Sequence, residues 1–235
     1  MKNQYFGDIN DFRKYGLLRV LSSNRNIKTA VCWMLTANDG RTDGQFTDYL
    51  SRPHRWRKYD PELFDMLREI VVDGKKRDVG RAEHAALITR ATYYSPELTD
   101  ENRNNYFAKF LKRVTPSHLL FLDPDNGFEV RSVSKGNPGS RKYLYWDEVS
   151  LFFSTGVSLL IYQHFPRIER KKFLTLIANQ IFAATKPRLV YAFETTRVAF
   201  FLIAQEHHLK SFRASIRKVT ETWGEEFFIH EFHRT

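Results

Sequence analysis

An acidic turn that also carries an amide side chain directly follows a short apolar segment near the middle of the chain. Residues 123–127 read DPDNG and come after the segment HLLFL at 118–122. An apolar run of this length, followed by turn residues, is typical of a buried strand. Binding sites in open α/β sheets lie beyond the carboxyl ends of the strands. We therefore expect the catalytic residues to be Asp123, Asp125 and Asn126.

Two carboxylates and a carboxamide in this turn are compatible with several reactions. In a base-excising hydrolase, a carboxylate activates water or stabilises positive charge on the sugar, while Asn126 hydrogen-bonds a base. In methyl transfer from S-adenosylmethionine, the Asp-Pro turn would accept a hydrogen bond from a base amine. In a nuclease, Mg²⁺ would be held by Asp123, Asp125 and Asp39. In a non-catalytic nucleic-acid-binding module, the same turn would be structural.

Our leading hypothesis is the first of these, hydrolysis of the N-glycosidic bond of an extruded base, without a metal or any other cofactor. Asp123 would activate water or stabilise the oxocarbenium-like transition state, and Asn126 would orient the base or the water. Asp125 would tune Asp123, because neighbouring carboxylates push their pKa values apart.

Another strand end, an early loop and the first helix supply polar side chains that would bind the substrate. Gln163 and His164 follow the apolar segment VSLLIY at 157–162, so they should lie at the same sheet edge as Asp123. A polar loop, TANDG at 36–40, follows an earlier apolar run. Helix capping explains Asp8 equally well. The substrate-binding residues that we expect are Asp8, Asp11, Lys14, Asn38, Asp39, Gln163 and His164.

The composition excludes several classes of protein. Of the 235 residues, 42% are hydrophobic, which is too many for a disordered chain. A single cysteine, Cys32, excludes a disulfide framework and a cysteine-rich zinc site. No apolar run reaches the about 18 residues of a membrane span, and the first residues lack the apolar core of a signal peptide. We therefore expect a cytoplasmic protein that does not bind membranes.

The charge favours a polyanionic partner. Lys and Arg number 37 against 27 Asp and Glu, which gives a formal net charge of +10. Strongly basic proteins commonly bind nucleic acid, so we expect DNA as the partner and keep RNA as an alternative. One basic stretch, 131–142, is also rich in Gly, Pro and Ser, as a mobile lid would be. The residues that we expect to contact phosphates are Arg52, Arg55, Arg57, Lys58, Arg131, Lys135, Arg141 and Lys142.

Short apolar segments alternate with amphipathic ones along the chain. The periodicity predicts strands at 27–35, 118–122, 157–162 and 189–193, with an edge strand at 226–232. It predicts a first helix that begins at Asp8 and ends before Asn24, and further helices at 101–114, 167–184 and 195–211. This order predicts a three-layer α/β fold, with a largely parallel Rossmann-like sheet and helices on both faces. We expect a single domain over 1–235, with a helical insertion at 46–98.

Two long motifs resemble a family of uncharacterised bacterial proteins. They are YFGDINDFRKYGLLR at 5–19 and FLDPDNG at 121–127. The stretches WMLT at 33–36, NDG at 38–40 and YQH at 162–164 are similar to that family as well, so the resemblance spans most of the chain.

The layout is more distantly similar to that of bacterial large-subunit rRNA adenine-N6 methyltransferases. Gly7-Asp8, Asp11 and Lys14-Tyr15 occupy places comparable to a motif of their opening helix, and the turn at 123–126 resembles their Asp-Pro-Pro-Tyr turn. This resemblance implies methyl transfer from S-adenosylmethionine. The chain departs from the pattern in two places. No glycine cluster follows the first strand, and Asp125-Asn126 replaces Pro-Tyr, so the aromatic that would stack on a flipped base is missing.

A basic, aromatic-rich chain with such a site also resembles DNA glycosylases, including those used against phages with modified cytosine. Aromatic residues make up 15% of the sequence. This resemblance implies base flipping, followed by removal of the base, in phage defence.

Overall fold

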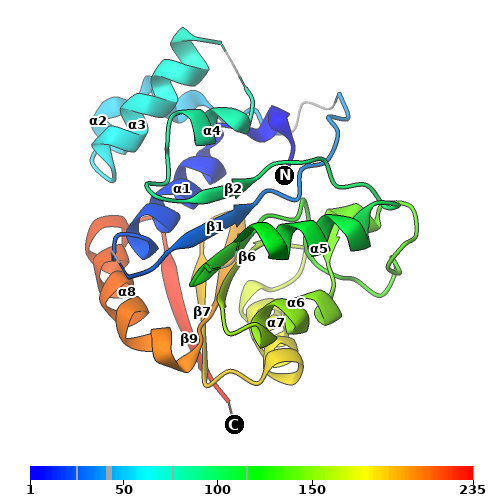
Figure 1. The fold of residues 1–235 in the computed structure, drawn as a ribbon. Helices are drawn as coiled ribbons and strands as arrows, with labels where there is room; N and C mark the ends of the chain where they lie inside the picture. The colour runs from blue at the N-terminus through cyan, green and yellow to red at the C-terminus, as the bar shows by residue number, and fades with distance from the viewer. Residues whose placement is uncertain (25, 41–43, 76, 115, 235) are drawn as a thin grey trace.

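A seven-stranded sheet forms the centre of the molecule (Figure 1). The computed structural model describes residues 1–24, 26–40, 44–75, 77–114 and 116–234. Across the sheet the strands follow the order β2-β1-β3-β6-β8-β7-β9. Their bounds are β1 Thr29–Cys32, β2 Thr92–Tyr94, β3 Leu119–Leu122, β6 Ser158–His164, β7 Leu189–Glu194, β8 Val198–Ile203 and β9 Phe228–His233. A separate two-stranded sheet pairs β4 Gly127–Phe128 with β5 Tyr143–Leu144.

Five of the seven strands run in the same direction. β1 is parallel to β2 and β3, and β3 is parallel to β6. β8 is antiparallel to both of its neighbours, β6 and β7, so β7 has the same direction as β6. β9 is antiparallel to β7 at the edge. The expected α/β fold with a largely parallel, Rossmann-like sheet is therefore confirmed.

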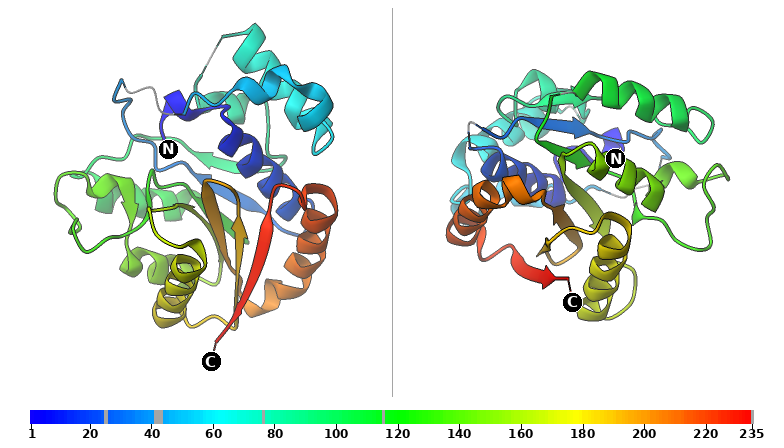
Figure 2. Two further views of the ribbon diagram at one scale, coloured as in Figure 1. Left: turned by 180° about the vertical axis from the view of Figure 1, so that it is seen from behind. Right: turned by 60° about the horizontal axis from the view of Figure 1, so that its bottom comes forward.

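Helices cover both faces of this sheet (Figures 1 and 2). α1 and α8 pack on one face, and α5, α6 and α7 pack on the other. No helix in the described part of the chain has the length and apolar character needed to cross a membrane. The bounds of the helices are α1 Ile9–Leu21, α2 Pro53–Trp56, α3 Pro61–Arg68, α4 Gly80–His84, α5 Arg103–Val114, α6 Trp146–Ser154, α7 Arg170–Thr185 and α8 Leu209–Trp223.

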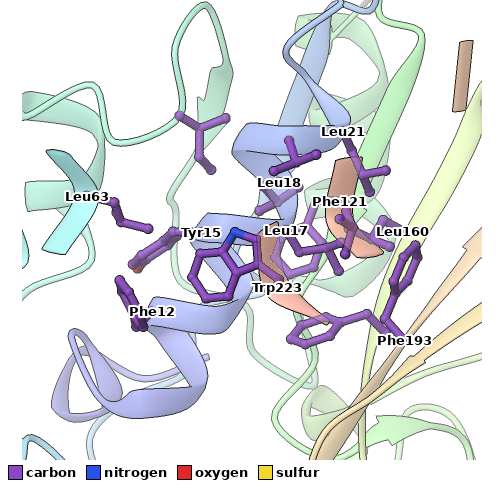
Figure 3. Close-up of a cluster of buried hydrophobic side chains, with 14 of the residues drawn as sticks. Phe12, Tyr15, Leu17, Leu18, Leu21, Leu63, Phe121, Leu160, Phe193 and Trp223 are labelled. Carbon is purple, nitrogen blue, oxygen red and sulfur yellow. The ribbon is translucent and has the colours of Figure 1, made fainter. Parts of the chain in front are cut away.

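Side chains of each central strand alternate between two hydrophobic cores. In β3, Phe121 belongs to the core beneath α1 and α8, whereas Leu122 belongs to the core beneath α5, α6 and α7. This alternation follows from the pleat, which turns successive side chains to opposite faces. Figure 3 shows the first core, which contains Phe12 of α1, Trp223 of α8 and Phe121 of β3. The rings of Phe12 and Trp223 are 5.0 Å apart, so aromatic contacts fix α1 against α8.

One predicted helix is wrong. The range 195–211 contains β8 and a short 3₁₀ turn, Glu206–His208, before α8 begins at Leu209. All six residues of β8 are buried. A continuous apolar run is compatible with both a buried strand and a buried helix. Here the segment forms a strand because it pairs with β6 and β7.

The segment 46–98 is helical in its first part and ends in a strand. It contains a 3₁₀ turn at Asp48–Ser51, then α2, α3, a π-helical turn at Glu69–Asp73 and α4. β2 follows and forms one edge of the central sheet. The helical part packs on α1, because Tyr49, Trp56 and Phe64 all contact the ring of Phe12.

Candidate functional site

The opening segment of the chain and the DPDNG turn meet at one small cavity. Asp8, Asp11, Lys14, Asp123 and Asp125 all line it, although they come from distant parts of the sequence. Its volume of about 40 Å³ is sufficient for ordered water. The structure thus brings residues of the first helix and of the turn, which we expected at one site, to the same cavity.

A larger cleft of about 370 Å³ opens beside this inner cavity. Such a volume is typical of sites for small molecules. The cleft and the inner cavity share Tyr5, Asp8, Asn10, Asp125 and Tyr162. Beyond these shared residues, the cleft is lined by Gly44, Phe46, Asn126, His164 and Arg197.

Asp8 sits at the amino end of α1 for a local reason. Its Oδ1 accepts hydrogen bonds from the backbone N–H groups of Asn10 (2.8 Å) and Asp11 (3.0 Å), which otherwise lack partners in the first helical turn. Gly7 precedes it with a φ of 78°, and its N–H donates to Asp11 Oδ2. The capping predicted from the sequence is thus present, and it also turns Asp8 toward the cleft.

Lys14 joins α1 to the DPDNG turn by two ion pairs. Its Nζ lies 2.7 Å from Asp11 Oδ1 and 2.7 Å from Asp123 Oδ2, and the side chains of all three residues are buried. The same ammonium lies 5.7 Å from the ring centroids of Trp33 and Tyr162. Burial disfavours the charge, but the two carboxylates outweigh it, so the pKa of Lys14 is raised and the ammonium stays charged.

The carboxyl groups at this site have pKa values that differ widely. Burial, with repulsion from Asp11, raises the pKa of Asp8 to about 7. Burial also raises the pKa of Asp123, although Lys14 opposes the shift. Burial opposes ionisation of Asp125 as well, but the Met1 ammonium at 2.7 Å and the Thr36 hydroxyl outweigh it and lower the pKa. Near neutral pH, Asp8 is therefore partly protonated while Asp125 is ionised.

Gln163 holds the backbone of the turn and does not line the cleft. Its Oε1 accepts a hydrogen bond from the Phe128 N–H (2.8 Å), and its Nε2 donates to the carbonyls of Asn126 (3.1 Å) and His164 (2.7 Å). Gly127 lies so close that an added Cβ would come within 2.2 Å of Gln163 Oε1. We therefore assign Gln163 a positioning role in place of the substrate binding expected from the sequence.

The remaining expected substrate-binding residues divide into two groups. Asn126 and His164 line the cleft. Asn38 and Asp39 do not contribute to its described lining, since Asn38 Oδ1 accepts a hydrogen bond from the Gln4 N–H and Asp39 pairs with Lys2.

The basic residues that we expected to contact phosphates lie on two separate segments, around α2 and between β4 and β5. Four of them pair with acidic side chains: Arg57 with Asp65, Lys58 with Glu225, Lys135 with Asp147 and Glu148, and Arg141 with Asp100. Arg52, Arg55 and Arg131 are exposed, whereas Lys142 is half-buried. None of the eight lines the cleft as described.

Six cleft residues were not predicted: Tyr5, Asn10, Gly44, Phe46, Tyr162 and Arg197. Asn10 Oδ1 is buried and has no hydrogen-bond partner in the described structure. The guanidinium of Arg197 lies 4.0 Å from the ring centroid of exposed Phe46. Tyr162 was open to prediction, because residues two apart on a strand share a face and His164 was expected at the site.

The described residues contain no group of three or more His, Cys, Asp and Glu side chains placed to hold a metal ion. Asp39, which a magnesium site would have shared with Asp123 and Asp125, pairs with Lys2 instead.

Comparison with known proteins gives one structural relative of interest. No family model and no curated protein matches the sequence. Among solved structures, the chain is similar to protein LPL1258 from Legionella pneumophila str. Philadelphia 1, which is assigned to the family DUF519. The two share 9% sequence identity with a TM-score of 0.52, and the match covers 98% of this chain and 97% of the other. At this identity the likeness concerns the fold alone, which the two proteins share over nearly their whole length.

Proposed function

We propose that this protein hydrolyses the N-glycosidic bond of a nucleotide whose base has been extruded from DNA into the cleft. One observation carries the proposal: Asp8 and Asp125 line the same cleft with pKa values shifted in opposite directions. A carboxyl that keeps its proton near pH 7, beside one that stays ionised, is the pair that acid-assisted glycosidic cleavage requires.

The cleft suits a flipped base in size and in the character of its walls. Its volume is about 370 Å³, and the aromatic residues Tyr5 and Tyr162 form part of its walls. The unpartnered Oδ1 of Asn10 would accept a hydrogen bond from a base amine. Enzymes that act on extruded bases combine contacts of these two kinds, an apolar wall and polar groups that read the base edge.

Asp8 is the catalytic acid in this proposal, and Asp125 takes the stabilising role that we expected of Asp123. Its Oδ1 caps α1, and its Oδ2 has no hydrogen-bond partner within the described ranges. As the bond between C1′ and the base nitrogen breaks, its electron pair leaves with the base, which takes the proton of Asp8. Water then adds to C1′ and returns a proton to Asp8. The ionised Asp125 stabilises positive charge on the sugar.

Asp123 and Lys14 act in this proposal as positioning residues. Asp123 is only 2% exposed, and its Oδ2 is bonded to Lys14. The pair holds the turn against α1, which places Asp125 on the same cleft as Asp8.

The test is an assay for abasic sites in duplexes that contain unmodified or modified cytosine, with RNA of the same sequence in parallel. Asp8→Asn is the decisive variant, because Asn caps a helix as well as Asp but cannot donate a carboxyl proton. We expect base release by the native protein and a loss of at least a hundredfold in Asp8→Asn, the usual contribution of a general acid. If no substrate releases base, the proposal fails.

The other reactions considered make different predictions in the same samples. A methyltransferase would bind S-adenosylmethionine in calorimetry. The segment after β1 does not fit that cofactor, because Trp33 and Met34 are fully buried and Thr36 is bonded to the backbone of Met1. A nuclease would cut strands in a reaction that EDTA abolishes. A non-catalytic DNA-binding module would keep its affinity for DNA after Asp123→Ala and Asn126→Ala. A role in phage defence predicts that cells carrying Asp8→Asn lose their resistance to phage.

A further inference from the structure

A basic groove continues from the mouth of the cleft along the start of α7. Its volume is about 600 Å³, and it shares His164 and Arg197 with the cleft. The groove runs over the residues 165–170, between the end of β6 and the first residue of α7, and over Thr196 in the turn from β7 to β8.

Arginines dominate the charge of this groove. Arg167, Arg170 and Arg197 line it against a single acidic residue, Glu169, whose carboxylate lies 2.7 Å from Lys172 Nζ. The lining therefore has a net charge of +2 with His164 neutral. A surface region with an excess of one charge attracts ions of the opposite sign.

The three arginines differ in what already holds them. Arg170 is engaged, because it bonds to the Thr196 carbonyl and lies 3.4 Å from Glu194. Arg167 and Arg197 are exposed, and neither has an acidic partner in the part of the chain that the structure describes. Arg197 is braced by stacking on Phe46, so its guanidinium is held at the junction of cleft and groove. Two uncompensated guanidinium groups thus line the groove, and one of them, Arg197, also lines the cleft.

We propose that this groove binds the phosphodiester backbone that flanks the nucleotide in the cleft, with Arg167 and Arg197 contacting phosphates. The proposal rests on the proposed function only for the identity of the ligand as nucleic acid. It moves the backbone contacts from the two sequence-predicted basic segments, where several side chains are neutralised by ion pairs, to the groove that adjoins the cleft. Arginine suits this role because its planar fork matches phosphate oxygens.

The experiment measures binding of labelled oligonucleotides to the full-length protein by fluorescence anisotropy over a series of salt concentrations. Single-stranded DNA, duplex DNA and RNA of the same sequence form three arms. All proteins carry Asp8→Asn so that the ligand stays intact. The variants are Arg167→Gln and Arg197→Gln, with Arg217→Gln as the matched control, since Arg217 is exposed on α8 and borders none of the described cavities that carry this argument.

We expect each groove variant to weaken binding about five- to tenfold at ~0.1 M salt and to lower the slope of log affinity against log salt by nearly one. Arg217→Gln should bind as the parent does. The arm with the tightest binding identifies the polymer. Equal weakening by all three substitutions would indicate a general field and overturn the proposal, as would unchanged binding in both groove variants or no binding to any arm.

The outcome separates this inference from the proposed function. Weakened binding in the groove variants, without base release from any substrate by the native protein, would leave the groove standing and remove the glycosylase. Base release with unchanged binding in both variants would do the opposite.

Discussion

Lys14 Nζ lies 2.7 Å from Asp123 Oδ2, and this buried contact joins residues 109 positions apart in the sequence. It fastens the first helix to the turn that follows β3. Because the same ammonium also pairs with Asp11, one cation compensates two buried carboxylates. Lys14 therefore compensates the charge of two side chains that line the inner cavity.

Replacing Lys14 by Met should destabilise the protein by about 3–5 kcal/mol, the usual cost of leaving a buried charge without its partner. Urea denaturation would measure it. Lys109→Met, at an exposed position of α5, is the control and should change stability by less than about 0.5 kcal/mol. Adding Asp123→Asn to Lys14→Met should recover part of the loss, and additive effects of the two changes would contradict the coupling.

Stability should depend on pH through Asp8. Its folded pKa of about 7 lies above the ordinary value of 3.8, so the folded state binds the proton of Asp8 more tightly than the unfolded state does. The stability that this proton contributes is fully present below about pH 4 and is lost as pH rises through 7. Asp8→Asn removes this dependence while keeping the helix cap. Between pH 4 and 8 the free energy of unfolding of the variant should rise relative to that of the native protein, by at most about 4 kcal/mol. Parallel curves of unfolding free energy against pH would refute the shift.

Activity should fall over the same interval if Asp8 donates a proton. The rate of base release at saturating substrate should decline as pH rises through about 7, because the acid form is then lost. Asp125→Asn should slow the reaction without moving this inflection, since Asp125 is already ionised there. An inflection that persists in residual activity of Asp8→Asn would assign it to another group.

Stability should also depend on the glycine at position 127, in the turn that follows β3. It has a φ of 109°, and a Cβ there would lie 2.2 Å from Gln163 Oε1, so Gly127→Ala should cost about 2–4 kcal/mol through strain and broken hydrogen bonds. Gly136→Ala is matched, because Gly136 has a φ of 85° with no atom within 4 Å of the added Cβ. Thermal unfolding should show a clearly smaller loss for this control. Similar losses would mean that the contact with Gln163 is unimportant.

Packing between α1 and α8 gives a prediction that does not involve the site. A Cβ on Gly16 would lie 2.1 Å from Trp223 Cζ2, so Gly16→Ala should destabilise by about 1–2 kcal/mol despite the better helix propensity of Ala. In a Trp223→Phe background the substitution should become neutral or stabilising, as chemical denaturation would show. A loss that persists there would place the cause elsewhere in the helix.

Most of the sheet could be predicted from sequence because its strands are short apolar runs bounded by turn residues. Four strands lie inside predicted segments or extend beyond them by no more than two residues: β1, β3, β6 and β7. β8 could not, since an unbroken apolar run has no period that separates strand from helix. Its assignment depends on pairing with β6 and β7, which is a property of the whole fold.

The same error hid part of the site. Arg197 lies in the turn between β7 and β8, so treating this region as the start of a helix gave no reason to place it beside His164. Gln163 was assigned to the site because it follows an apolar run. The strand pleat turns Gln163 away from the face that Tyr162 and His164 share. Which of the two faces borders the cleft follows from the fold and cannot be told from the sequence.

The position of β8 has a consequence for a chain that is still being made. β6 and β7 are synthesised before it, yet β8 must come to lie between them. Until residues 198–203 emerge, the hydrogen-bonding edges of β6 and β7 have no native partner on that side. Exposed, apolar strand edges of this kind are prone to pair with other chains. Aggregation during synthesis should therefore be greatest for ribosome-bound chains from which β7 has emerged and β8 has not.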